Sequence, residues 1–291
     1  MAVVARGPHL KAIRSQGLRV ESDLGAFTAK LEAADDLREL GAFDVLVLTF
    51  KSHQWPGMLP QLQPLRDTRA ALVTLQNGVP FWFERDPPLR SVDPGGAIGS
   101  LFSDDRVIGG VVHVSGQIVE PGAIRQSGGL RYVFGEPNGG GSERVEALVA
   151  LLRGAGLAAE ADANLRSTLW LKLVNNCGLN AASVLQRQTI KPMLADPRSR
   201  ALVRALMVEA LAVGQAMGVV AQADVDARIE YAARLDDVKT SMLQDFEAGR
   251  PLETGPILGA AVELAERYGV AVPRLREALV QLARIAGEGD A

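Results

Sequence analysis

The sequence predicts an α/β domain with a largely parallel sheet over residues 1–163, followed by an all-α domain over residues 164–291. Two almost continuous apolar runs, Phe43–Phe50 and Ala70–Leu75, have the pattern of parallel strands that are buried on both faces. The segment between them has the length of a helix, so the three together predict a βαβ unit. Beyond residue 163, apolar residues recur at helical spacing, which predicts the second domain.

The remaining elements of the α/β half are short. Ala2–Ala5 predicts a buried strand, a helix is expected near His9–Gln16, and two strands at 18–20 and 27–29 flank a polar turn. Ser142 suits a helix N-cap, which predicts a helix from there to about Arg153. Further strands are expected at 98–102, 107–114, 130–134 and 158–161.

The helical half begins with a helix over residues 165–185. Asp196 and Pro197 have the N-cap and N1 chemistry that starts a second helix, and Gly218 is suited to end it. Further helices are expected at 224–235, 236–248, 255–268 and 273–285.

Composition narrows the class of protein. The chain has 291 residues, 47% of them hydrophobic and 22% charged, which is typical of a globular enzyme. A net charge of −3 argues against a nucleic-acid surface, and no apolar run reaches the ~20 residues that span a membrane. With three histidines and one cysteine, Cys177, neither a zinc site nor an internal disulfide is expected. We therefore expect a cytoplasmic protein with no metal, no nucleic-acid partner and no membrane segment.

A candidate active site lies on the helix over residues 165–185. Lys172, Asn176 and Asn180 are four residues apart, so on a helix their side chains share one face. Trp170 and Leu173 make the surroundings apolar, and a lysine that loses hydration has a lowered pKa and can donate a proton near neutral pH. The alternative is a buried helix whose lysine reaches water and whose asparagines bind loops.

Polar residues also follow the predicted parallel strands. Lys51 and Asn77 come after the two buried runs, and ligands of open α/β sheets bind at the carboxyl ends of strands. Arg6 follows the first strand, where an arginine would suit a 2′-phosphate. Each of these three could instead be a surface or turn residue. In the helical half, Glu253 either starts a helix, where the dipole favours a carboxylate, or faces Lys172.

Five segments occur in the order found in ketopantoate reductases (2-dehydropantoate 2-reductases), and the chain resembles that family from residue 3 to about residue 285. The segments are Val4-Ala-Arg-Gly7, Thr49-Phe-Lys51, Gln76-Asn-Gly78, Leu169-Trp-Leu-Lys-Leu-Val-Asn-Asn176, and Ser241-Met-Leu-Gln-Asp245 through Glu253. The last two carry the resemblance, since an Asn-Gly pair or a lone arginine is common.

The resemblance implies an N-terminal Rossmann domain that binds NADPH, a helical C-terminal domain and an active site in the cleft between them. It implies that NADPH reduces 2-dehydropantoate to pantoate, in the synthesis of pantothenate and coenzyme A, with Lys172 as general acid. The catalytic residues would be Lys172 and Glu253. The cofactor would be held by Arg6, Lys51, Asn77 and Glu253, and the substrate by Lys172, Asn176, Asn180 and Ser241. A homodimer is compatible with this prediction.

The chain departs from the family pattern in two places. It has no Gly-x-Gly-x-x-Gly, the turn that cradles the pyrophosphate and follows a central strand. Without that strand, two neighbouring strands are expected to have bare inner edges. Because every later motif is intact, we expect about 25–30 further residues upstream of Met1, the size of such a strand-turn-helix unit. Ile190 stands where some members have a substrate-binding asparagine.

Three functions follow as hypotheses. The first is ketopantoate reduction with NADPH, and the second is the reduction of another 2-oxo acid by a paralogue. The third is a non-catalytic remnant that keeps the helical domain for dimerisation. Binding of NADPH by this chain would separate the third hypothesis from the first two, since phosphate contacts carry much of dinucleotide recognition.

Overall fold

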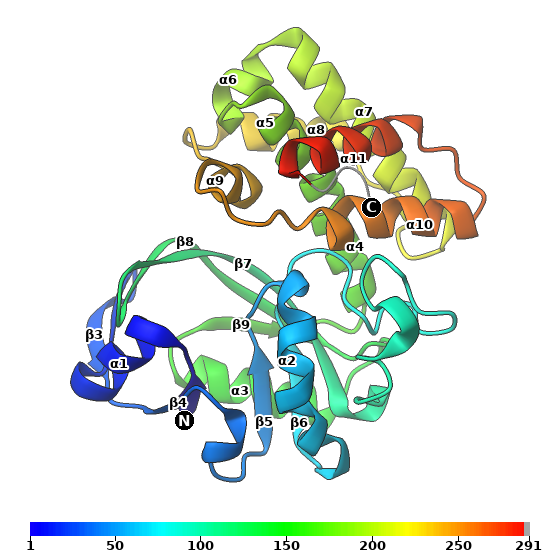
Figure 1. Ribbon diagram of the computed structural model, residues 1–291. Coiled ribbons are helices and arrows are strands. Elements are labelled where there is room, and N and C mark those ends of the chain that lie inside the picture. Colours follow the sequence, from blue (N-terminus) through cyan, green and yellow to red (C-terminus); the bar gives the residue numbers. More distant parts are fainter. Residues whose placement is uncertain (288–291) are drawn as a thin grey trace. The chain divides into compact units, whose positions relative to one another are not determined.

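A computed structural model describes residues 1–287, which form two compact units (Figure 1). The sheet unit consists of residues 1–49, 56–75 and 101–165. The helical unit consists of residues 50–55, 76–100 and 166–287 of the described chain. Two short segments of the N-terminal half, one after each buried run, therefore belong with the helices.

The sheet unit contains a mixed sheet built around a long hairpin. Its strands lie in the order β3-β2-β8-β7-β6-β5, and β9 also pairs with β8. The pair β5–β6 is parallel, as the βαβ pattern predicts, and so is the pair β6–β7. Strands β7 and β8 form the antiparallel hairpin. The strands are β2 (Leu18–Ser22), β3 (Gly25–Ala29), β5 (Val45–Leu48), β6 (Ala71–Thr74), β7 (Val107–Glu120), β8 (Ala123–Gly135) and β9 (Ala158–Ala161).

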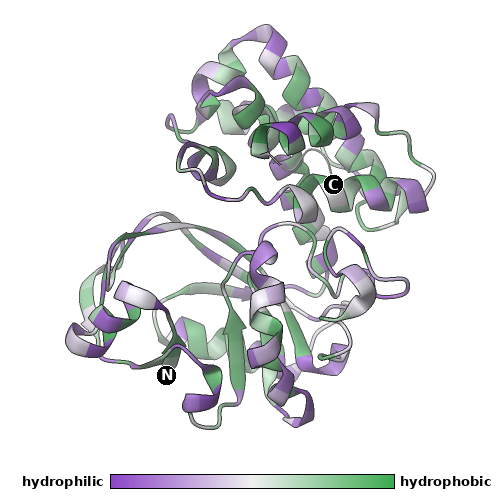
Figure 2. Ribbon diagram, viewed as in Figure 1, coloured by the Kyte–Doolittle hydropathy of each residue, from purple (hydrophilic) through white to green (hydrophobic). Residues whose placement is uncertain are grey.

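A second, two-stranded sheet consists of β1 (Ala2–Val4) and β4 (Glu32–Ala34), which are parallel. Among residues 1–287, β1 pairs only with β4, and β5 pairs only with β6. Both strands therefore have a free edge, as expected from a chain without the central strand. Val45 and Val47 of β5 are 39% and 44% exposed, although Figure 2 shows this strand as hydrophobic.

Helices complete the sheet unit. Helix α3 (Glu143–Gly154) begins at Ser142, whose hydroxyl accepts a hydrogen bond from the backbone of Val145. Its Val145, Leu148 and Val149 pack on Val73, Ile108 and Phe134 of the sheet. Helix α1 (Gly7–Gln16) follows β1, and α2 (Trp55–Leu62) connects β5 to β6. Short 3₁₀ turns lie at Leu37–Glu39, Ser52–Gln54, Gln63–Asp67, Pro94–Gly96 and Asp104–Arg106.

The helical unit contains eight α-helices in its described residues. They are α4 (Leu165–Asn175), α5 (Ala181–Gln186), α6 (Ile190–Ala195), α7 (Pro197–Ala216), α8 (Val225–Arg234), α9 (Ser241–Glu247), α10 (Ala260–Arg267) and α11 (Pro273–Ala286). Two π-helical turns, η6 (Asn176–Asn180) and η7 (Gly255–Gly259), lead into α5 and α10. The expected N-cap of α7 is confirmed, because the Asp196 carboxylate accepts from the backbone of Ser199.

Two predicted elements are wrong. Residues 98–102 form turns rather than a strand, because the carboxylate of Asp93 accepts from the backbone N–H groups of Ile98 and Gly99. The helix expected at 236–248 begins only at Ser241, after the N-cap Thr240. The residues before it are used differently: Asp237 and Val238 accept hydrogen bonds from the backbone at the start of α6.

Within residues 1–287 no helix combines the length and the apolar composition that crossing a membrane requires.

Candidate active site

Three residues that are far apart in the sequence form a connected polar chain in the helical unit. The ammonium group of Lys172 donates to Oδ1 of Asn77 at 3.0 Å. The Nδ2 of the same amide donates to Oε2 of Glu253 at 3.4 Å. Asn77 thus uses its acceptor for the lysine and its donor for the carboxylate, which fixes the orientation of the amide.

Lys172 is held by the packing of α4. Leu169, Trp170 and Leu173 are buried around it. The indole N–H of Trp170 donates to the backbone oxygen of Ala210 at 2.9 Å, which ties α4 to α7. At Gly214 the two helices approach so closely that an added Cβ would lie 2.3 Å from the indole.

Asn77 is held by the residues on both sides of it in the chain. The side chain of Gln76 donates to the backbone oxygen of Phe50 at 3.1 Å. Gly78 has a φ of +81°, and a Cβ there would lie 2.5 Å from the carbonyl oxygen of Pro256. The N–H of Val79 donates to that same oxygen at 2.7 Å. Only glycine fits between Asn77 and this contact.

Burial shifts the pKa values of Lys172 and Glu253 in opposite directions. Burial lowers the pKa of Lys172 to about 8, although the carboxylate of Glu253 opposes this shift. Burial raises the pKa of Glu253, and the nearby ammonium of Lys51 and the amide of Asn77 counteract part of the rise. A lysine with a pKa near 8 exchanges its proton much more readily at neutral pH than an ordinary lysine does. The ammonium group of Lys172 can therefore deliver a proton to an oxygen placed beside it.

Lys51 lies in a second cluster of the same unit. Its ammonium forms an ion pair with the buried carboxylate of Asp245 on α9. The guanidinium of Arg250 binds the other oxygen of that carboxylate at 2.8 Å. Asp245 belongs to the motif that the sequence singled out, but its part in holding Lys51 was not predicted, because charge pairs between distant segments leave no periodic signal.

The other predicted residues lie at different places. Asn176 and Asn180 are the first and last residues of the π-turn η6, and Asn180 is buried. A π-turn has more residues per turn than an α-helix, so the regular stripe expected from four-residue spacing is interrupted there. Ser241 is the exposed first residue of α9. Arg6 belongs to the sheet unit, where its side chain donates to the sulfur of Met58 at 2.7 Å.

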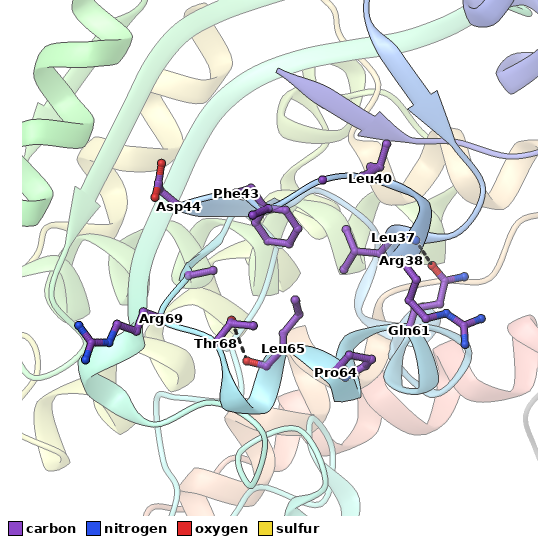
Figure 3. Close-up of a pocket in the computed structure, with 13 residues that line it drawn as sticks. Leu37, Arg38, Leu40, Phe43, Asp44, Gln61, Pro64, Leu65, Thr68 and Arg69 are labelled. Atoms are coloured by element: carbon purple, nitrogen blue, oxygen red, sulfur yellow. Dashed lines mark hydrogen bonds between the residues drawn. The ribbon is translucent and has the colours of Figure 1, made fainter.

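A pocket of about 520 Å³ lies in the sheet unit and contains none of the predicted residues (Figure 3). Leu37, Phe43 and Leu65 give it an apolar lining. Asp44 and Ala70, also in the lining, directly precede β5 and β6, so the pocket lies at the amino ends of these strands. Ligands of open α/β sheets bind at the opposite, carboxyl ends, so its position does not favour a cofactor site. Within the described chain, no group of three His, Cys, Asp or Glu side chains is arranged to hold a metal ion.

Comparison with known proteins places both halves of the chain in one family. Residues 1–139 match the family model described as ketopantoate reductase PanE/ApbA, and residues 164–286 match the model of its C-terminal part. The chain is 40% identical over 295 residues to a protein of Mesorhizobium japonicum named 2-dehydropantoate 2-reductase, covering 99% of this chain and 90% of that protein.

Solved structures of the same family have a similar fold. The fold matches a 2-dehydropantoate 2-reductase of Geobacter metallireducens with a TM-score of 0.85 at 30% identity, covering 99% of this chain and 91% of the other. It matches the enzyme of the same name from Methylococcus capsulatus with a TM-score of 0.85 at 29% identity, covering 100% and 90% of the two chains.

Proposed function

The chain belongs to the ketopantoate reductase family and is an oxidoreductase of that family, and we propose that it reduces the 2-oxo group of 2-dehydropantoate to the hydroxyl of pantoate with NADPH. The observation that carries the proposal is the partly buried polar chain Lys172–Asn77–Glu253, with a lysine pKa of about 8.

Lys172 is the proton donor of the proposed reaction. When hydride adds to the keto carbon, the carbonyl π electrons move to the oxygen, which must then receive a proton. An ammonium within hydrogen-bond reach of that oxygen supplies it and becomes a neutral amine, which solvent protonates again. Asn77 keeps the ammonium directed, and Glu253 fixes the amide of Asn77 by accepting from its Nδ2.

The residues at the reacting end fit a nicotinamide cofactor. NADPH, when bound, supplies the hydride. Asn77 and Lys51 follow β6 and β5, at the strand ends where open α/β sheets hold cofactors. The pyrophosphate of the cofactor has fewer binding groups, since residues 1–287 contain no glycine-rich turn between a strand and a helix. Arg6 is the residue that we assign to the 2′-phosphate.

For the substrate we assign Asn176, Asn180 and Ser241, together with Lys172. Asn176 and Asn180 have side-chain amides that can donate to carboxylate and hydroxyl oxygens. The buried Ile190 at the start of α6 offers only apolar contact, which bears on which 2-oxo acids are accepted.

The test is NADPH oxidation by this chain with 2-dehydropantoate and with a panel of other 2-oxo acids, followed by identification of the product. We expect the highest kcat/KM with 2-dehydropantoate and pantoate as product. A higher kcat/KM with another 2-oxo acid would favour a paralogue, and inactivity towards all of them would contradict the reductase assignment. The homodimer stays a prediction, which sedimentation of the chain tests.

A further inference from the structure

The segment 76–92 carries Asn77 and is fastened to the rest of the helical unit at several points. Close to Asn77, the N–H of Val79 donates to the backbone oxygen of Pro256 at 2.7 Å. In its middle, the ring of Phe83 stacks on Trp170 with 5.7 Å between ring centroids. The segment therefore contacts both α4, which carries Lys172, and the stretch that follows Glu253.

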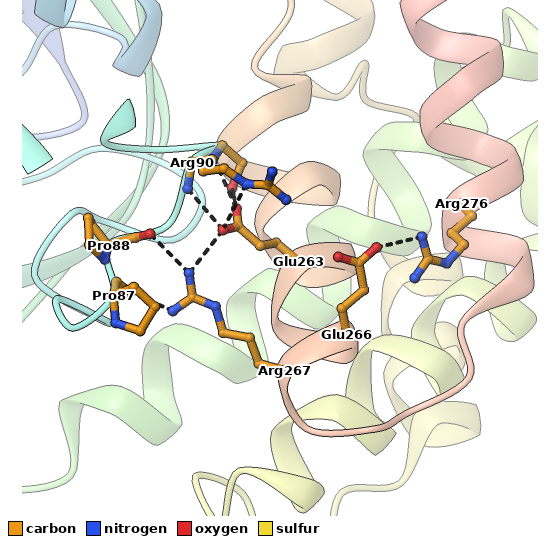
Figure 4. Close-up of polar contacts among 8 residues, drawn as sticks. Pro87, Pro88, Arg90, Glu263, Glu266, Arg267 and Arg276 are labelled. Atoms are coloured by element: carbon orange, nitrogen blue, oxygen red, sulfur yellow. Dashed lines mark hydrogen bonds and ion pairs between the residues drawn. The ribbon is translucent and has the colours of Figure 1, made fainter. Parts of the chain in front are cut away.

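The far end of the segment is bound by one carboxylate. Glu263 of α10 accepts from the backbone N–H groups of Arg90 and Ser91 at 3.0 and 3.1 Å, and from the hydroxyl of Ser91 at 2.9 Å. It also accepts from the guanidinium of Arg267 at 2.9 Å (Figure 4). The side chain of Glu263 is only 11% exposed, so these bonds replace most of its hydration.

Arg267 extends the same attachment along the segment. It donates to the backbone oxygens of Pro87 and Pro88 at 2.6 and 2.9 Å. The pair Glu263–Arg267 thus binds backbone donors and backbone acceptors of residues 87–91 at once (Figure 4). Two opposite charges on one helix face fix the position of the segment along the helix as well as its distance from it.

The helix that makes this attachment belongs to the same stretch as Glu253. From Glu253 the chain passes through η7 into α10, and η7 approaches the segment closely. A Cβ at Gly255 would lie 2.9 Å from the backbone oxygen of Ser91, and one at Gly259 would lie 3.3 Å from its Cβ. The segment 76–92 and the stretch that follows Glu253 are therefore in contact along most of their length. The contacts begin at Gly78 with Pro256 and end at Pro87 and Pro88 with Arg267.

Burial alone would raise the pKa of Glu263, but the backbone and hydroxyl donors of Arg90 and Ser91, together with Arg267, hold it below its ordinary value. Glu263 is therefore charged at neutral pH.

From this arrangement we infer that Glu263, acting with Arg267, is a positioning residue of the reaction: it sets where the segment 76–92 lies on α10 and thereby where Asn77 meets Lys172 and Glu253. The inference rests on the proposed function, because the consequence of a displaced Asn77 is a slower proton transfer. Glu263 itself makes no hydrogen bond to Lys172, Asn77 or Glu253.

The variant that tests the inference is Glu263→Gln. The amide has nearly the shape of the carboxylate, but its NH₂ group cannot accept from the N–H donors it would face. Glu266→Gln is the matched control, because Glu266 lies on the same helix and pairs with Arg276 at 2.8 Å on the surface, away from the segment (Figure 4). Ser91→Ala serves as a milder variant, because it removes the hydroxyl bond to Glu263 and leaves the two backbone bonds in place.

We expect Glu263→Gln to lower kcat by roughly 10- to 100-fold with the KM for NADPH unchanged, because displacement by about 1 Å has effects of that size. Amide hydrogen exchange in residues 76–79 should become about tenfold faster, as expected for a loss of ~1.4 kcal/mol of local stability. Ser91→Ala should show both effects to a smaller degree, and Glu266→Gln neither.

Faster exchange with an unchanged kcat would overturn the positioning role. A loss of kcat that follows a loss of folded protein, in step with the melting temperature, would do so too. If the unaltered chain proves inactive, the proposed function fails instead, and the exchange measurement still decides on the attachment: unchanged exchange at residues 76–79 in Glu263→Gln would refute it.

Discussion

The two units differ in how their polar groups are paired: the site residues of the helical unit are hydrogen-bonded to one another, whereas two strands of the sheet unit each have an edge that is unpaired within residues 1–287. In the helical unit Asn77 bonds to Lys172 on one side and to Glu253 on the other, and Gly78 beside it allows a backbone contact that no other residue would permit. In the sheet unit β1 and β5 each have a free edge in the described chain, and β5 exposes Val45 and Val47.

This difference separates two requirements of the proposed reaction. Proton delivery depends on packing inside the helical unit, where the geometry is complete. By our assignment, recognition of the 2′-phosphate depends on the sheet unit, where Arg6 lies and where a strand edge is free. Substitutions of Lys172 in the helical unit and of Arg6 in the sheet unit should therefore affect different quantities: kcat for Lys172, and binding of NADPH for Arg6.

The largest effect is expected at Lys172. Lys172→Ala should lower kcat by roughly 10²–10⁴-fold, the usual range for loss of a general acid, whereas the dissociation constant of NADPH should change little. The exposed Lys191 gives the control variant Lys191→Ala, which should match the unaltered chain in both quantities. Steady-state kinetics and a direct binding titration measure the two. A parallel loss of affinity and turnover would make Lys172 a structural residue.

A large effect on stability is expected at Gly78. Gly78→Ala should destabilise the chain by about 2–4 kcal/mol, because the backbone strain at positive φ adds to overpacking against Pro256. Gly249 has a φ of +62° and open space around it, so Gly249→Ala isolates the strain and should cost about 1 kcal/mol. Denaturant unfolding of both variants gives the difference. Equal costs would mean that the contact with Pro256 yields easily and does not hold Asn77.

A moderate effect is expected in the sheet unit at Arg6. Arg6→Ala should weaken NADPH binding roughly 10- to 150-fold while leaving NADH binding nearly unchanged, since a charged hydrogen bond to a phosphate is worth ~1.5–3 kcal/mol and only NADPH carries the 2′-phosphate. Lys11→Ala, on helix α1 just after Arg6, is the control for a general loss of positive charge. Titration with both nucleotides measures the preference, and an unchanged ratio would show that Arg6 does not recognise that phosphate.

The smallest effect is expected at the free edge of β5. Val47→Thr should cost less than ~0.5 kcal/mol, as is usual for surface substitutions, because Val47 is 44% exposed. The fully buried Val73 of β6 is the matched position, where Val73→Thr should cost about 1–3 kcal/mol for an added buried hydroxyl. Unfolding free energies of the two variants decide whether the face of β5 that carries Val47 is uncovered in solution. A cost at Val47 as high as that at Val73 would mean that something covers it.

The same contrast explains what the sequence could predict. The parallel pairing of β5 with β6, the caps at Ser142 and Asp196, and the lowered pKa of Lys172 all arise from local composition, so they are visible in a single stretch. The burial of β5 on both faces was predicted wrongly, since Val45 and Val47 are exposed. The contact of Asn77 with Glu253 joins residues 176 positions apart, and only the family resemblance brought these two together.

The wrongly predicted secondary-structure elements also have local causes. The expected strand at 98–102 has apolar residues, but Asp93 takes the backbone donors that pairing would need. The expected start of α9 near Asp236 failed because Asp237 and Val238 bind the start of α6. Each is a competition for backbone hydrogen bonds that residue patterns do not resolve. The π-turn η6 was missed because four-residue spacing suits an ordinary helix equally well.

The central claim is that Lys172, held by Asn77 and Glu253, delivers the proton. The most direct test is kcat for 2-dehydropantoate reduction as a function of pH from 6 to 10. The donor must be protonated, and the pKa of Lys172 is about 8. The rate should therefore be flat below that pH and fall about tenfold per unit above it. A rate that rises through pH 8, or one that stays constant to pH 10, would contradict the account.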